Sequence, residues 1–254
     1  MTTLDERLRE LRRARRALVP YFVGGLTTDW SQYVHGAILA GADVIEVGVP
    51  FSDPMMDGPV IQDGSLRALR AGATLESICH ELAAANFDVP IVLMTYFNVL
   101  HHFGLERAAA LLAASGVAGV IVPDLALEES GDWREVATAA DVATVLMVAP
   151  STPPERVHLI GAASQGFVYA AARMAVTGRA TDVGEAERVV RAIRLATDLP
   201  TYVGIGITTP EQAGHAARLS DGVIVGSAIV QQILDGADAS AIESLIGKFR
   251  HALD

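Results

Sequence analysis

The sequence predicts an α/β protein: a single (β/α)8 barrel, or TIM barrel, formed by residues 1–254, with an extra N-terminal helix. Two observations support this prediction. Eight short apolar runs alternate with longer amphipathic stretches, and the runs recur about every 30 residues, which is the size of one strand–helix unit. The runs are also apolar throughout. This is typical of parallel strands covered on both faces, and eight such units make a closed barrel.

The predicted strands are these apolar runs, most of which end at Gly, Pro, Asp or Ser. They span residues 17–23, 44–49, 90–96, 119–123, 144–149, 166–171, 200–205 and 222–225. A doubly wound open sheet is the alternative, but its dinucleotide-binding form carries GxGxxG after the first strand. Here that strand is followed by Gly24-Gly25-Leu26-Thr27, which lacks the spacing. The pattern therefore favours the barrel.

The stretches between the strands predict helices, and many of them begin at residues suited to a helix start. These helices span residues 29–40, 74–86, 105–115, 128–140, 153–164, 184–197 and 210–219, and a short helix is expected at 227–234. A further helix at residues 4–16 precedes the first strand. We expect it to close the bottom of the barrel or to lie on its side.

Composition disfavours several classes of function. The net charge of −11 repels nucleic acid and anionic lipid, no apolar run approaches the roughly 18 residues of a membrane span, and the N-terminus is charged, unlike a signal peptide. We therefore expect a cytoplasmic protein. The chain has a single cysteine, Cys79, which disfavours multi-cysteine metal sites. It also has a single lysine, Lys248, in a C-terminal surface helix, which disfavours Schiff-base chemistry and pyridoxal phosphate. The histidines lack metal-ligand spacing, so no metal and no other cofactor is expected.

The ends of the seventh and eighth strands predict a phosphate site. Gly206 and Gly226 follow these strands, and Ser227 begins the short helix. Glycine lets backbone N–H groups approach an anion, a helix N-terminus adds unpaired donors, and this edge of a barrel commonly binds phosphate. Thr177 and Gly178, in the loop after the sixth strand, would complete the site. Ordinary turn glycines are the alternative.

A buried carboxyl group is predicted at Glu46, the one charge inside the apolar second strand. Alternation places it on the same side as Val44 and Gly48, facing either the barrel interior or the helices. Burial raises the pKa of a carboxyl group, which would make Glu46 a usable proton donor and acceptor near neutral pH. A structural pair with an arginine is the alternative.

The loop after this strand adds a second carboxylate. Asp57 could reach over the barrel mouth as a catalytic group or act as a turn residue, whereas Asp53 is expected to hold the loop's own turn. Tyr169 lies in the sixth strand, and a carboxylate across the barrel would serve as the partner of its hydroxyl. Met94 and Ile121 would supply apolar walls for a flat ring, or simply belong to the core.

Residues 43–59, which read DVIEVGVPFSDPMMDGP, closely resemble the signature of tryptophan synthase alpha chains. Matching segments continue along nearly the whole chain, at residues 94–98, 122–125, 167–171, 176–178, 204–207 and 226–230. The resemblance implies a (β/α)8 barrel that cleaves indole-3-glycerol phosphate to indole and glyceraldehyde 3-phosphate. It also implies a beta chain as partner, in an α2β2 assembly.

The resemblance also implies roles for particular residues. Glu46 and Asp57 correspond to the catalytic pair, and Tyr169 to a tyrosine near the glutamate. The phosphate-binding positions correspond to Gly178, Gly206, Gly226 and Ser227. Positions that meet the beta chain correspond to Pro50, Asp53 and Asn98.

Two loops depart from the family pattern. Leu26-Thr27 stands where the family often has Asp-Pro, and Met174-Ala175 where it has Ser-Gly, in the loop expected to close over the site. Three alternatives therefore stay open beside an alpha chain that works with a beta chain. They are a free-standing lyase that releases indole, a non-catalytic phosphate-binding barrel that regulates a partner, and another phosphosugar aldolase or isomerase.

Overall fold

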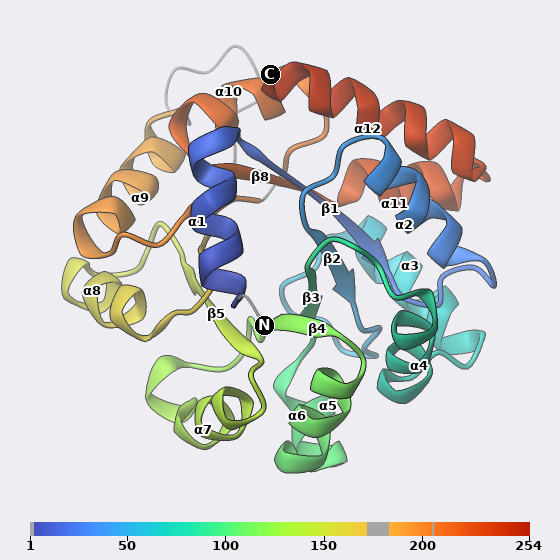
Figure 1. Cartoon of the computed structure of the whole chain (residues 1–254), viewed down its shortest axis with the longest axis horizontal. Helices are drawn as coiled ribbons and strands as arrows, with labels where there is room; N and C mark the ends of the chain where they lie inside the picture. Colours follow the sequence, from blue (N-terminus) through green and yellow to red (C-terminus); the bar gives the residue numbers. More distant parts are fainter. Residues whose placement is uncertain (1–2, 172–182, 205) are drawn as a thin grey trace.

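Eight parallel strands form a closed barrel, as the sequence predicts (Figure 1). The computed structural model describes residues 3–171, 183–204 and 206–254. The strands pair in chain order, and the eighth pairs with the first. They are β1 Ala17–Val23, β2 Ile45–Gly48, β3 Ile91–Met94, β4 Val117–Ile121, β5 Ala143–Val148, β6 Val168–Ala170, β7 Thr201–Val203 and β8 Gly222–Val225. Several predicted runs extend past the paired residues, because burial continues beyond the ladder: Val44 and Val49 are buried on either side of β2.

Helices surround the barrel (Figure 1). They are α1 Leu4–Ala14, α2 Trp30–Leu39, α3 Pro59–Arg70, α4 Leu75–Ala85, α5 Phe97–Phe103, α6 Leu105–Ala114, α7 Gly131–Ala139, α8 Pro154–Ala163, α9 Val183–Ala196, α10 Pro210–Leu219, α11 Ser227–Leu234 and α12 Ala239–Leu253. None of the described helices is long and apolar enough to cross a membrane.

Most predicted helices are confirmed to within a few residues, with three differences. The stretch 128–140 is a short 3₁₀ helix, Leu127–Glu129, followed by the separate helix α7. Helices α3 and α5 were not predicted. α3 begins with Pro59 at its first turn, directly after a loop rich in proline, so its start is hidden in a segment that reads as loop.

Alternation along β2 separates the interior of the barrel from the shell of helices. Val44 belongs to the interior cluster, whereas Ile45 and Val47 pack in the outer cluster with the helices. Glu46 therefore points into the barrel. Its neighbours in register are Tyr21 of β1 and Val92 of β3.

Helix α1 closes the N-terminal end of the barrel, which decides between the two predicted positions (Figure 1). Leu4 and Leu8 are buried and pack into the interior cluster. The helix starts at a capping box in which Thr3 accepts the N–H of Glu6 and the Glu6 side chain accepts the N–H of Thr3. With this end sealed, a ligand can enter the barrel from the opposite end, where the strands finish.

Candidate active site at the mouth of the barrel

Glu46 lies inside the barrel with 2% of its surface exposed. Burial raises the pKa of its carboxyl group to about 8, and the nearby Asp57 carboxylate adds to the effect. Among the described residues no arginine pairs with Glu46, and its Oε2 atom has no hydrogen-bond partner. Glu46 is therefore available to hold or release a proton near neutral pH, and the alternative of a structural ion pair is not supported.

Asp57 is held over the mouth by Tyr96, which follows β3. The Tyr96 hydroxyl donates a hydrogen bond to Asp57 Oδ2 at 3.1 Å and accepts one from the N–H of Met56 at 3.0 Å. The Tyr96 ring also stacks on Phe51 at the start of the same loop, with ring centroids 5.1 Å apart. Burial raises the pKa of Asp57, while the hydrogen bond from Tyr96 opposes the rise.

The charge of Asp57 reaches Glu46 and raises its pKa, so the two carboxyl groups lie near each other. Both carboxylates raise the pKa of the buried hydroxyls of Tyr21 and Tyr169, although burial is the larger cause. Sequence reasoning assigned no role to Tyr21 or Tyr96. The available signals were the inward alternation of Tyr21 on the first strand and the position of Tyr96 at the end of the third strand.

Tyr169 does not bond a carboxylate in this structure, so that prediction is wrong. Its hydroxyl donates to the carbonyl of Gly204 at 2.6 Å. A Cβ atom at position 204 would lie 2.5 Å from the Tyr169 oxygen, so glycine is needed for this approach. The tyrosine is thereby fixed between β6 and the end of β7, with its ring inside the barrel and facing the interior cluster.

Apolar side chains surround the carboxylates. Ile121 is fully buried in the interior cluster, and Met94 is half-buried. Met94 also packs against a second cluster at the mouth that includes Tyr21, Ile61 and Val230. Ile61 belongs to α3, one of the helices that the sequence analysis missed. The side chains that pack at the mouth of the barrel are therefore mostly apolar.

The predicted phosphate residues lie on the adjacent turns after β7 and β8. Gly206 has a positive φ of 73°, is exposed, and would have no atom within 4 Å of an added Cβ. Gly226 precedes α11, and Ser227 is the first residue of that helix. The first N–H groups of a helix lack partners within the helix and can bind an anion. Thr177, Gly178 and the Met174-Ala175 departure lie outside the described residues.

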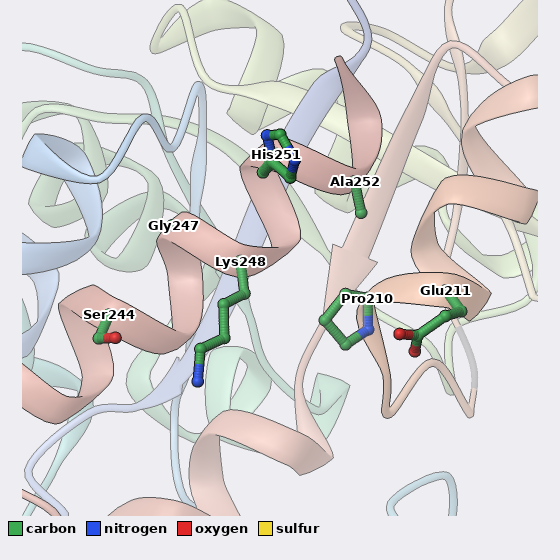
Figure 2. A pocket seen from close by; sticks show the side chains of 7 residues that line it. All are labelled: Pro210, Glu211, Ser244, Gly247, Lys248, His251 and Ala252. Atoms are coloured by element: carbon green, nitrogen blue, oxygen red, sulfur yellow. The ribbon is translucent and has the colours of Figure 1, made fainter.

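Other features of the described residues do not add to this site. They contain no group of three His, Cys, Asp or Glu side chains that could hold a metal ion. A surface groove of about 570 Å³ lies between α10 and α12, and Lys248 and His251 border it (Figure 2). None of the predicted site residues lines this groove. Asp53 is exposed in its loop and accepts a hydrogen bond from the Ser52 hydroxyl at 2.6 Å.

The fold and the site define a class: a (β/α)8-barrel protein with a buried carboxyl group of raised pKa inside the barrel. A family model described as tryptophan synthase alpha chain matches residues 8–249. The chain belongs to that family, and the resemblance noted in the sequence is confirmed.

Individual relatives support the same family assignment. The tryptophan synthase alpha chain of Streptomyces coelicolor is 45% identical over 232 residues, covering 89% of this chain and 86% of the relative. That of Halorhodospira halophila is 42% identical over 265 residues, covering 100% and 97%. The crystal structure of the alpha subunit from Legionella pneumophila matches with a TM-score of 0.91 at 29% identity, covering 100% and 99%. Tryptophan synthase from M. tuberculosis matches with a TM-score of 0.90 at 33% identity, covering 100% and 99%.

Proposed function

We propose that Glu46 and Asp57 carry out the reaction of this family, in which indole-3-glycerol phosphate is cleaved to indole and glyceraldehyde 3-phosphate. The chain is a carbon–carbon lyase of tryptophan biosynthesis. The observation that carries the residue assignment is the position of Glu46: a buried carboxyl group, pointing into the barrel, with a pKa raised to about 8.

The cleavage is a retro-aldol step that this pair can support. Glu46, protonated, donates its proton to indole C3, which turns the ring into an electron-poor indolenine. The resulting carboxylate takes the proton of the hydroxyl group on the adjacent chain carbon. The bond between C3 and that carbon then breaks, its electron pair returns to the ring, and the chain carbon becomes an aldehyde.

Asp57 has a different task in this proposal. Its carboxylate accepts a hydrogen bond from the indole N–H and stabilises the positive charge that develops on the ring. Tyr96 fixes the position of that carboxylate through the 3.1 Å hydrogen bond. The negative charge on Asp57 also raises the pKa of Glu46 and so helps Glu46 to keep its proton before the step.

The remaining predicted residues are assigned to substrate binding. Met94, Ile121 and Tyr169 are assigned to the apolar ring. The burial of Ile121 and Tyr169 and the partial burial of Met94 support this role. The phosphate is assigned to backbone N–H groups at Gly206, Gly226 and Ser227, with Thr177 and Gly178 added from the sequence motif alone.

Tryptophan synthase alpha chains form complexes with a beta chain. We assign the docking face to the loop of β2, which includes Pro50 and Asp53, and to Asn98. In that loop Met55 and Met56 are 77% and 50% exposed, which supports an apolar contact there. Since the family is biosynthetic, we place the protein in the cytoplasm.

An assay of the purified chain with indole-3-glycerol phosphate, with and without a beta chain, tests this proposal. We expect slow release of indole alone and a large gain on adding the beta chain. Fast unaided release would identify a free-standing lyase. Glu46→Gln should abolish cleavage while the substrate still binds. No indole from the wild type would refute the proposed reaction and favour a non-catalytic barrel or another reaction. Undiminished turnover in Glu46→Gln would instead refute the role of Glu46 as proton donor.

A further inference from the structure

An arginine cluster lies at the N-terminal end of the barrel, opposite the mouth. The sequence Arg12-Arg13-Ala14-Arg15-Arg16 places four arginines within five positions of a chain whose net charge is −11. In the structure two of them, Arg12 and Arg16, meet Arg194 of α9 at one carboxylate. That carboxylate is Asp221, directly before β8.

The three guanidinium groups converge on a single oxygen. Asp221 Oδ1 lies 3.1 Å from Arg12 Nε, 3.3 Å from a terminal nitrogen of Arg194 and 3.8 Å from one of Arg16. The other oxygen, Oδ2, accepts the N–H of Thr201 at 3.0 Å. Asp221 is 2% exposed, whereas the side chains of the three arginines are 36%, 40% and 41% exposed. The carboxylate therefore forms a buried floor, and the arginines form a rim that faces solvent.

This rim carries more positive charge than its floor can balance. Three guanidinium groups face one carboxylate, and no second carboxylate of the described residues lies within 4.0 Å of them. Arg12 also donates to the carbonyl of Asp198 at 3.0 Å, which is a neutral acceptor. The surplus at the rim is two positive charges.

The neighbouring ion pairs do not supply the missing negative charge. Asp43 is paired with Arg15 and Arg250, and Arg250 also pairs with Asp254, so the charges of that group already balance. Like charges held a few ångströms apart repel, and an anion placed between them removes the repulsion.

We infer that Arg12, Arg16 and Arg194 form a second anion-binding site, which takes a small phosphate-type dianion. Each guanidinium group has five N–H donors in a planar fork that matches the oxygens of a phosphate, and few of those donors are used by the described residues. The site is separate from the proposed substrate phosphate site at the mouth. Its ligand would bridge α1, α9 and the residue directly before β1, and would therefore stabilise the folded chain.

The test compares the rise in melting temperature that inorganic phosphate causes, relative to chloride at matched ionic strength, in three full-length proteins. They are the wild type, Arg16→Gln/Arg194→Gln, and the control Arg107→Gln/Arg156→Gln. The control also removes two exposed arginines, each paired with one glutamate. The mouth site is unchanged in all three proteins. Because the comparison uses only the phosphate-dependent increment, a lower starting stability does not affect it.

We expect phosphate to raise the melting temperature of the wild type and of the control by the same amount. In Arg16→Gln/Arg194→Gln at least half of this rise should be lost. The dissociation constant of the second phosphate in a calorimetric titration should rise at least tenfold in the same variant. If the double variant does not fold, Arg16→Gln alone serves, since its contact with Asp221 is the longest of the three. A titration with glycerol 3-phosphate separates a site for free phosphate from one for phosphate esters, by which ligand binds more tightly.

Equal increments in all three proteins would overturn the inference, and so would an equal loss in the control, because that result would reflect general screening of charge. Cleavage of indole-3-glycerol phosphate should be unaffected by the Arg16→Gln/Arg194→Gln change, so the outcome is independent of the proposed catalytic roles.

Discussion

Glu46→Gln should change the way in which the stability of the folded chain depends on pH. Burial, with a further contribution from the charge of Asp57, raises the pKa of Glu46 from 4.5 to about 8 in the folded chain. In the unfolded chain the same group is exposed to water and has its ordinary pKa. Between these two values the folded state keeps a proton that the unfolded state has released.

The sign and size of the effect follow from linkage. The stabilising contribution of Glu46 is fully present below its unfolded pKa of 4.5, and it is lost as pH rises through the folded pKa of about 8. Inside this window each pH unit removes about 1.4 kcal/mol from the free energy of unfolding. Between about pH 5.5 and pH 7.5 the loss amounts to about 2.7 kcal/mol. Glutamine does not titrate, so Glu46→Gln lacks this loss.

Urea unfolding of the wild type and Glu46→Gln across this pH range provides the measurement. The free energy of unfolding of the variant should rise relative to the wild type by about 2–3 kcal/mol from the acidic to the neutral end. Contributions from histidines and other groups are common to both proteins and cancel in the difference. Glu187→Gln, which removes an exposed carboxylate of α9, controls for the loss of one negative charge. Parallel curves for the wild type and Glu46→Gln would refute the reasoning that burial holds a proton on Glu46.

Three further predictions concern other parts of the molecule. Tyr96→Phe removes a hydrogen bond that lowers the pKa of Asp57, so the pKa of Asp57 should rise. The acidic limb of the pH–kcat/KM profile should then move to higher pH, and turnover at neutral pH should fall about tenfold. An unchanged profile would show that Tyr96 does not position Asp57. Ser227→Asp should weaken the binding of phosphate esters by like-charge repulsion, measured calorimetrically, and unchanged affinity would contradict the phosphate assignment. Leu8→Ala should lower the free energy of unfolding by about 2–5 kcal/mol while kcat stays near that of the wild type, because the side chain is buried at the sealed end of the barrel; a large loss of kcat without loss of stability would contradict this role.

Local patterns in the sequence were enough to predict several residues of the candidate site. The period of two along residues 44–48 places Glu46 with Val44 and opposite Ile45 and Val47, and the structure keeps that division. Gly206 and Gly226 could be predicted as phosphate-binding residues because barrel topology fixes where the seventh and eighth strands end. Tyr96 was missed because its function depends on a loop about forty residues earlier in the chain, which spacing along the sequence does not reveal.

The sequence by itself determined the barrel and the family, because apolar runs at a regular spacing, breaks at glycine and proline, and a local motif can all be read along the chain. Only the tertiary structure decided which side of β2 faces the interior, where α1 lies, that Tyr169 bonds the Gly204 carbonyl, and that three arginines meet at Asp221. Those outcomes depend on distances between segments far apart in the chain. Closing the barrel sets these distances, since each strand must match the tilt and register of both neighbours before any side chain inside it has a fixed partner.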